Sequence, residues 1–410
     1  MISATERLYF TDSHLTEFTA RVAEVTSLGE GRAAVKLDRT AFYPTGGGQP
    51  TDTGTLDGAR VVECVDQEEA GVLHIIEGPA PEMDAVVKGR VDWPRRLDHL
   101  QQHTGQHILS QAFIELFAAP TRSFRMMERA SEIDVALDSP SDERIEQAVD
   151  LANRIIWENR PIRIHNVTAS EAAQLPLRKD STREGELRII EIEGFDMTPC
   201  GGTHAKRTGE VGLMAARAWE RAKGLARIEF VAGGRALADY RRANTVARSV
   251  AAIFSVGRDE APLSVTHLLE ENKQLARRAR ALGELAARAE ANELLGETGQ
   301  TNGGTRLVAR VFDGRDAEDL KRLAQAIVAH PQTIALLGSR DTSEAKESGA
   351  RLVFARSIDL AADMNALMRS ACTELEGRGG GRPELAQGGG RHAERLAETI
   401  ERAVGKLTEG

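Results

Sequence analysis

The sequence predicts an α+β protein that begins with a small β-barrel and ends with an α/β domain. Two patterns lead to this prediction. Short β-branched runs, separated by Gly, Asp and Pro, fill residues 1–92, and the hydrophobic period becomes helical after Pro94. The chain has 410 residues, and domains typically have roughly 100–200 residues, so we expect several domains. We expect four segments: residues 1–92, 93–233, 234–299 and 300–410.

Composition and charge exclude several classes of protein. The 53 Lys and Arg residues against 62 Asp and Glu give a net charge of −9, which argues against a protein held on nucleic acid by bulk charge alone. No run approaches the roughly 18 apolar residues of a membrane helix. With three cysteines and no secretory layout at the amino terminus, we expect a soluble, cytoplasmic protein without membrane contact.

The first segment contains the runs expected to be barrel strands, at Arg32–Leu37, Arg60–Cys64 and Val72–Ile76. Between two of them lies AFYPTGGGQPTDTG, residues 41–54, which is too rich in Gly and Pro for an ordinary strand. We therefore expect a special turn here, either with a purely steric role or in contact with a ligand.

The second segment holds two spaced pairs of potential metal ligands. His103 and His107 are four apart on an expected helix, which places both imidazoles on one face. Cys200 and His204 flank a glycine-rich turn that can fold back on the same point. Three His and one Cys suit tetrahedral zinc, so we expect a Zn²⁺ site formed by these four residues.

The role of this zinc stays open from the residues alone. Thr104 stands where the HExxH proteases carry a glutamate, so a peptidase is disfavoured. Four simultaneous ligands make a closed, structural site, whereas an enzyme needs one open position. His204 is the ligand that we expect to leave most readily and to act as the catalytic base.

The third segment shows a seven-residue repeat within residues 263–295. One set of positions is Val265, Asn272, Ala279 and Ala286, and the matching set three residues later is Leu268, Leu275, Leu282 and Ala289. Such a pattern is typical of a helix–helix seam. A homodimer, a helical hairpin and a helix packed on its own domain all remain possible interpretations.

The last segment follows a linker at residues 296–304 and reads as an α/β domain. Strands are expected at Leu307–Phe312, Ile334–Leu337 and Leu352–Ala355, each followed by a helical pattern. The run GRGGGRPELAQGGG, residues 377–390, precedes a further helix, and we interpret it as glycine loops whose amides meet phosphate.

Five blocks make the sequence resemble the alanyl-tRNA editing proteins, free-standing relatives of the alanyl-tRNA synthetase editing domain. They are FYPTGGGQPTDTG, LQQHTGQHILSQAF, DMTPCGGTH, RIEFVAG and GGGRPELAQGGG, in the family's order and over nearly the whole chain. The last block resembles a DHHA1 domain. The resemblance implies hydrolysis of tRNA(Ala) mischarged with serine or glycine, at a zinc site whose ligands here are His103, His107, Cys200 and His204.

On this resemblance, the glycine-rich turn becomes the substrate-binding loop. A pocket for alanine cannot strongly exclude serine, so a second site must bond the additional hydroxyl. Thr45 is our candidate for that contact, Gly46, Gly47 and Gly48 let the backbone approach the terminal adenosine, and Gln49 holds the loop or the ligand. The expected RNA contacts are Arg221, Lys223, Arg227 and Arg235 around RIEFVAG, and Arg378, Arg382 and Arg391 beside the terminal glycines.

Other functions remain open. The related threonyl-tRNA synthetase editing domain carries the same two motifs and works without metal, so an ion-free reaction is one alternative. An editor of another mischarged tRNA, such as Ser-tRNA(Thr), and a non-catalytic zinc-containing tRNA-binding protein are two more. With about 90 residues before the HxxxH helix, we do not expect aminoacylation, and without an Asp-His-His motif we do not expect phosphodiester cleavage.

Overall fold

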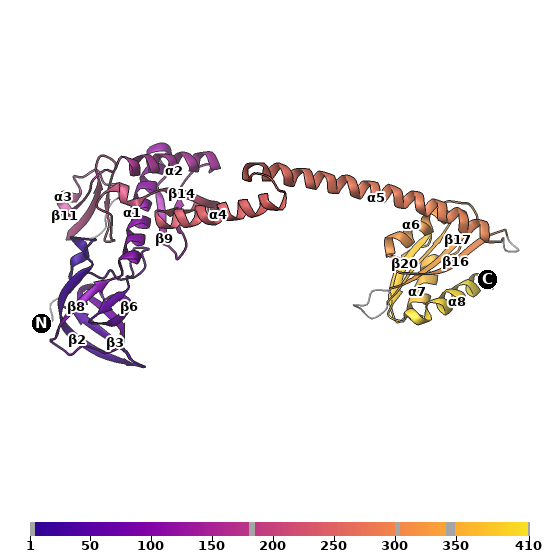
Figure 1. Cartoon of the computed structure of the whole chain (residues 1–410), viewed down its shortest axis with the longest axis horizontal. Helices are drawn as coiled ribbons and strands as arrows, with labels where there is room; N and C mark the ends of the chain where they lie inside the picture. Colours follow the sequence, from indigo (N-terminus) through magenta and orange to yellow (C-terminus); the bar gives the residue numbers. More distant parts are fainter. Residues whose placement is uncertain (1–4, 180–184, 300–303, 342–348, 409–410) are drawn as a thin grey trace. The chain divides into compact units, whose positions relative to one another are not determined.

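The computed structural model describes residues 5–179, 185–299, 304–341 and 349–408. The chain forms two compact units, residues 1–253 and 254–410, which are described separately (Figure 1). The division falls inside the segment 234–299 for which a helical connection is expected. That expectation is met by two helices, α4 (Gly234–Ile253) and α5 (Ala261–Glu297).

The first unit begins with a closed six-stranded barrel, which confirms the expected amino-terminal fold. In the order of their pairing, its strands are β2 (Glu17–Gly29), β3 (Arg32–Leu37), β7 (Val72–Glu77), β6 (Ala59–Asp66), β5 (Gly54–Leu56) and β8 (Val86–Val91). Alternate residues of β2, Phe18, Ala20 and Val22, point into the barrel core, as the two-residue period of a strand requires. A short parallel pair, β1 (Glu6–Arg7) and β4 (Arg39–Thr40), and the turn η1 (Leu8–Phe10) lie beside it.

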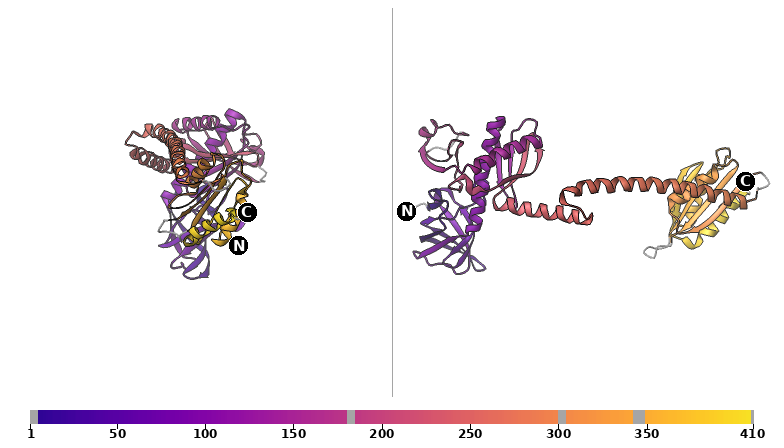
Figure 2. Two further views of the ribbon diagram at one scale, coloured as in Figure 1. Left: turned by 90° about the vertical axis from the view of Figure 1, so that its right-hand side faces the viewer. Right: turned by 45° about the horizontal axis from the view of Figure 1, so that its top comes forward.

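Helix α1 (Trp93–Phe117) leads from the barrel into the rest of the unit, as Figure 1 and the right view of Figure 2 show. Pro94 stands in its first turn, where a missing N–H costs nothing, and Ala118 ends it in the left-handed conformation. Its apolar face packs with α2 (Asp142–Trp157) on a four-stranded sheet. The sheet order is β14 (Met214–Ala222), β15 (Leu225–Ala232), β10 (Ser131–Val135) and β9 (Thr121–Met126).

A second, three-stranded sheet carries the segment that leads to Cys200. It consists of β11 (Ile162–Thr168), β12 (Glu186–Ile192) and β13 (Asp196–Pro199), with the short helix α3 (Ala169–Ala172) between its first two strands. Strand β13 ends immediately before Cys200. The turn η3 (Thr208–Val211) follows His204 and packs against α1 and α2, so the ligand-bearing turn is held at both ends.

A buried ion pair joins α1 to the barrel. The Arg96 guanidinium is fully buried and contacts the carboxylate of Asp52, with its Nε 3.1 Å from Oδ2. The two terminal nitrogens of Arg96 also donate to the carbonyl oxygens of Ser13 and Ala41, both at 2.6 Å. Because Asp52 lies three residues after Gln49, this contact fixes the glycine-rich turn relative to the helix that carries the histidines.

The second unit is a five-stranded mixed sheet with helices on both faces, as expected for the last domain. The strand order is β16 (Arg306–Asp313), β17 (Thr333–Arg340), β18 (Ala350–Arg356), β20 (Leu385–Gly390) and β19 (Arg378–Arg382). Helix α6 (Ala317–Val328) and the end of α5 cover one face. Helices α7 (Met364–Glu374) and α8 (Leu396–Thr408) cover the other. The helix expected after the strand at 334–337 falls at residues 342–348, outside the described residues.

The interpretation of residues 377–390 as glycine loops is wrong, because these residues form the hairpin β19–β20. Their amides pair in an antiparallel ladder from Arg378–Gly389 to Arg382–Leu385. The glycines serve close packing: a Cβ at Gly379 would lie 2.6 Å from the Cys372 sulfur on α7. A glycine-rich sequence therefore marks here a sheet that approaches a helix closely, and not a phosphate cradle.

The repeat in α5 divides into a packed and an exposed part. Ala287, Ala291 and Leu295 are buried against α6 and the sheet. The leucines of the repeat are exposed within the chain, Leu268 at 51%, Leu275 at 63% and Leu282 at 65%. Among the described residues, no helix combines the length and the apolar character that crossing a bilayer requires.

Candidate metal centre

The two ligand pairs meet at one point. The potential ligand atoms of His103, His107, Cys200 and His204 all lie within 4.8 Å of one another. The Cys200 sulfur is 3.5 Å from Nε2 of His103 and 3.4 Å from Nε2 of His204. In a tetrahedral zinc site, with Zn–N near 2.0–2.1 Å and Zn–S near 2.3 Å, nitrogen and sulfur lie about 3.5 Å apart. The donor set and its spacing therefore fit a metal ion.

Gly202 allows this close approach. A Cβ built at this position would overlap Cε1 and Nδ1 of the His103 ring and lie 3.2 Å from Nε2. The turn thus folds directly over the histidine on α1. The neighbouring Gly201 has free space, since its nearest contact would be 4.0 Å away, on the Phe10 ring.

Each histidine is held through its second ring nitrogen by a different element of the unit. The Nδ1 contacts are His103 with Gln49 Oε1 at 2.8 Å, His107 with Asp196 Oδ2 at 3.2 Å, and His204 with Thr104 Oγ1 at 3.4 Å. When Nδ1 carries the proton and donates it, Nε2 keeps its lone pair for an ion. The amide oxygen of Gln49 and the carboxylate of Asp196 can only accept, so these two contacts select that tautomer for His103 and His107.

The surroundings favour the metal-binding form of three of the four residues, the Cys200 thiolate and the neutral rings of His103 and His204. Burial alone would raise the pKa of the Cys200 thiol, but the adjacent His103 and His204 rings lower it well below its usual range. Burial, reinforced by the neighbouring imidazoles, lowers the pKa of His204 well below its usual range. Burial also lowers the pKa of His103. For His107, the hydrogen bonds to Asp196 and Cys200 outweigh burial and raise the pKa.

The glycine-rich turn lies against this cluster. Gln49 is buried and bonds both sides of the centre: its Oε1 accepts from His103, and its Nε2 donates to Thr203 Oγ1 at 2.8 Å. Gly48 has a positive φ of 83°, and a Cβ there would lie 2.5 Å from the carbonyl oxygen of Phe124 on β9. Thr45, at the start of the turn, is exposed.

Three outer residues of the centre were not singled out from the sequence. Asp196 on β13 is fully buried and is itself held by Arg178, whose Nε lies 2.8 Å from Oδ1. Thr104 and Arg188 are the other two, in contact with the His204 ring and with the Cys200 carbonyl oxygen. A carboxylate four residues before the cysteine ligand is the one local signal that pointed to Asp196, since metal-binding histidines commonly donate to carboxylates.

The structure separates the expected RNA-contacting arginines into two groups. Arg227 lies among carboxylates, with its Nε 2.8 Å from Asp134, and Arg235 pairs with Asp98 at 2.6 Å. Arg391 pairs with Glu376. Arg221 and Lys223 lie at the exposed β14–β15 hairpin, and Arg378 and Arg382 are exposed on β19. Ion pairing makes the first group less available to phosphate.

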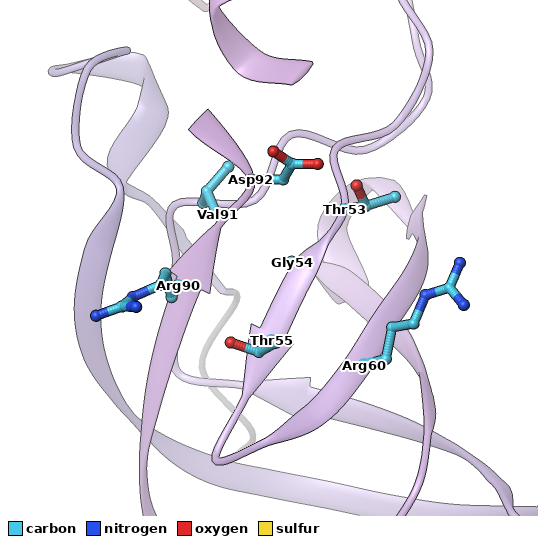
Figure 3. A pocket seen from close by; sticks show the side chains of 7 residues that line it. All are labelled: Thr53, Gly54, Thr55, Arg60, Arg90, Val91 and Asp92. Atoms are coloured by element: carbon cyan, nitrogen blue, oxygen red, sulfur yellow. The ribbon is translucent and has the colours of Figure 1, made fainter. Parts of the chain in front are cut away.

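A separate hollow of about 410 Å³ lies on the barrel wall (Figure 3). It is lined by residues of β5, β6 and β8 and the adjoining segments, none of which belongs to the His/Cys cluster. The side chains of Arg60 and Arg90 point away from each other in Figure 3, and they pair with Glu77 and Glu17. Their charges therefore do not converge on a ligand.

Comparison with known proteins identifies the family. The alanyl-tRNA editing protein AlaX-L of Pyrococcus horikoshii is 32% identical over 395 residues, which cover 93% of this chain and 94% of that protein. The chain belongs to the alanyl-tRNA editing protein family. The family model described as the threonyl and alanyl tRNA synthetase second additional domain matches residues 187–229 of this editing-family chain, and the DHHA1 domain matches residues 303–409.

Longer relatives of this editing-family protein are also similar. The alanine–tRNA ligase of Pyrobaculum neutrophilum is 32% identical over 98% of this chain but only 44% of its own length. The chain thus spans less than half of such ligases. The crystal structure of the C-Ala domain from Aquifex aeolicus alanyl-tRNA synthetase matches 24% of this chain and 86% of that chain, at 26% identity and a TM-score of 0.22.

Proposed function

We propose that the protein is a trans-editing hydrolase that removes serine, or glycine, from mischarged tRNA(Ala) at a Zn²⁺ centre formed by His103, His107, Cys200 and His204. The contact between Gln49 and His103 is the observation that carries this proposal, because it joins the expected substrate loop directly to the ligand cluster. The family assignment and the similarity to AlaX-L support the choice of tRNA.

A zinc ion bound there would polarise the ester carbonyl and lower the pKa of a bound water. The residues of the chain supply binding, orientation and proton transfer. Thr45 is exposed at the start of the loop, and we assign its hydroxyl to the serine side chain. Serine would gain this hydrogen bond and alanine would not, so the loop favours hydrolysis of the seryl ester over the correct one.

His204 is our candidate for the base that takes a proton from the attacking water. Its ring contacts Cys200 through Nε2 and Thr104 through Nδ1. To act as the base it must give up its place beside Cys200, which leaves three ligands and one open position. This arrangement resembles catalytic zinc sites, which keep three protein ligands and one exchangeable position.

A second candidate function is a tRNA-binding protein with a structural zinc ion. The convergence of all four potential ligands within 4.8 Å favours this reading, since closed four-ligand sites are typically structural. It predicts tRNA affinity without turnover. An editor of Ser-tRNA(Thr) is the alternative within the enzyme class.

Serine release from purified Ser-tRNA(Ala) tests these candidates together. We expect release from Ser-tRNA(Ala), little from Ala-tRNA(Ala), and less from Ser-tRNA(Thr), with zinc present in the native protein. Gly-tRNA(Ala) measures the second substrate. The variants His103→Ala and Cys200→Ala should lose both metal and turnover, and full activity in both would exclude the assigned centre. Affinity without serine release would favour the structural zinc protein.

We further propose that a second copy of the chain covers the exposed leucines of α5, giving a homodimer through residues 263–295. The repeat places Leu268, Leu275 and Leu282 at one heptad position, and all three are more than half exposed. Asn272 at the other position would fix the register of the two helices. A partner helix is the occupant that a seven-residue period fits.

For tRNA contact, we retain Arg221, Lys223, Arg378 and Arg382 as the primary candidates, and Arg227 and Arg391 as ion-paired secondary ones. Replacing Arg378, Arg382 and Arg391 together should weaken tRNA binding and flatten its dependence on salt, because fewer counterions are released. Cleavage of a short acceptor-stem mimic should be unchanged. Unaltered tRNA affinity would remove these three residues from the interface.

A further inference from the structure

Arg188 on β12 holds the turn that carries Cys200 from two sides. Its Nη1 donates to the carbonyl oxygens of Cys200 at 2.7 Å and of Gly202 at 2.9 Å. Its own carbonyl accepts from the Cys200 amide at 3.0 Å. Side chain and backbone of one residue therefore bind the segment on both sides of Gly201.

The same guanidinium reaches the amino-terminal part of the chain. Nε of Arg188 donates to the carbonyl oxygen of Phe10 at 3.0 Å, and its central carbon lies 5.4 Å from the centre of the Phe10 ring. Phe10 belongs to η1, beside the barrel. Arg188 thus ties the Cys200 turn to a rigid neighbour as well as to its own sheet.

The turn depends on such external support. Gly201 and Gly202 have more conformational freedom than any other residue pair, so the sequence alone does not fix where the Cys200 sulfur lies. A guanidinium offers several donors in a fixed plane, whereas an ammonium group is a single point on a flexible stem. Nη2 of Arg188 is buried and has no partner among the described residues, so the side chain is held there for its other contacts.

We propose that Arg188 is a positioning residue: its Nη1 bonds the carbonyls on both sides of Gly201 while its Nε is anchored on Phe10, and this places the Cys200 sulfur at the distance from His103 and His204 that a shared metal ion requires. This inference rests on the metal centre of the proposed function. It concerns geometry rather than charge, because lysine would keep the positive charge but has one nitrogen, whereas arginine uses Nε for Phe10 and Nη1 for the turn. Arg188 is not assigned any contact with substrate.

The test compares Arg188→Lys and Arg188→Gln with a matched control, Arg163→Met. Arg163 lies on the neighbouring strand β11 in an exposed ion pair with Glu193. Zinc affinity is measured by competition with a chromophoric chelator, and the thiolate–metal absorption band is recorded after loading the full chain with Co²⁺. Thermal unfolding of each metal-free variant is measured in parallel.

We expect both Arg188 variants to bind zinc at least tenfold more weakly and to show a weakened or shifted cobalt–thiolate band, while Arg163→Met matches the native protein. Native affinity in Arg188→Lys would overturn the proposal, as would a variant that melts earlier yet keeps affinity and band. If Arg188→Gln does not fold, Arg188→Lys decides alone. A native protein that binds metal but releases no serine overturns only the proposed editing function, whereas one that binds no metal overturns the centre itself.

Discussion

The substitution Gly202→Ala should disrupt the candidate metal centre with little change to the rest of the fold. A Cβ at this position would overlap two atoms of the His103 ring, so the ring or the turn must retreat by about 1 Å or more. Metal–ligand distances tolerate deviations of only about 0.2 Å. The displacement therefore removes one ligand, and we expect metal affinity to fall by at least about 100-fold. Loss of a hydrogen-bond partner of a ligand typically lowers metal affinity by only about 10–100-fold.

Gly201→Ala is the matched control, because its Cβ would meet only the Phe10 ring, at 4.0 Å, and its φ is not in the left-handed region. Metal content after gel filtration and chelator competition should separate the two variants, with circular dichroism to verify folding. Native metal affinity in Gly202→Ala, or an equal loss in Gly201→Ala, would refute the argument from close approach.

Three further outcomes follow from named contacts. Asp196→Asn should weaken metal binding by about 10–100-fold because His107 loses its carboxylate partner; chelator competition measures this, and Asp134→Asn, in a more exposed ion pair, should not. Burial lowers the pKa of His74 to about 4. As pH falls from 6.5 towards 4, His74 is therefore protonated in the unfolded chain but not in the folded one, and the folded state loses stability. The free energy of unfolding, measured in urea, should fall by about 2 kcal/mol between pH 7 and 5, and the variant His74→Asn should lack this decrease. Leu275→Glu with Leu282→Glu should halve the molar mass seen by light scattering, and a native chain that is already monomeric would exclude the α5 dimer.

The ligand residues could be proposed from the sequence because their chemistry is local. A four-residue spacing on a helix fixes one pair, and the glycine-flanked Cys200 and His204 supply the other. That the two pairs meet depends on tertiary structure. The contacts of Asp196 and Arg188 are harder to predict from the sequence, because the pairing of β12 with β13 brings these residues to the centre.

One expectation was wrong because of a neighbour that the sequence does not show. The glycines at 379 and 388 were assigned to phosphate, but they leave room for the Cys372 sulfur of α7. The sequence shows the missing side chain and not the neighbour that requires its absence. The RNA contact of Arg227 stays a prediction, but a count of basic residues does not reveal that Arg227 faces Asp134 across two paired strands.

The hydrogen bond between Gln49 and His103 spans two structural parts, the barrel and helix α1. The His103 ring thus takes its orientation from a residue 54 positions earlier in the chain. A fragment without the barrel and the glycine-rich turn would keep all four candidate metal ligands but lose Gln49, the group that orients His103. A chimeric protein should therefore keep the barrel and helix α1 together.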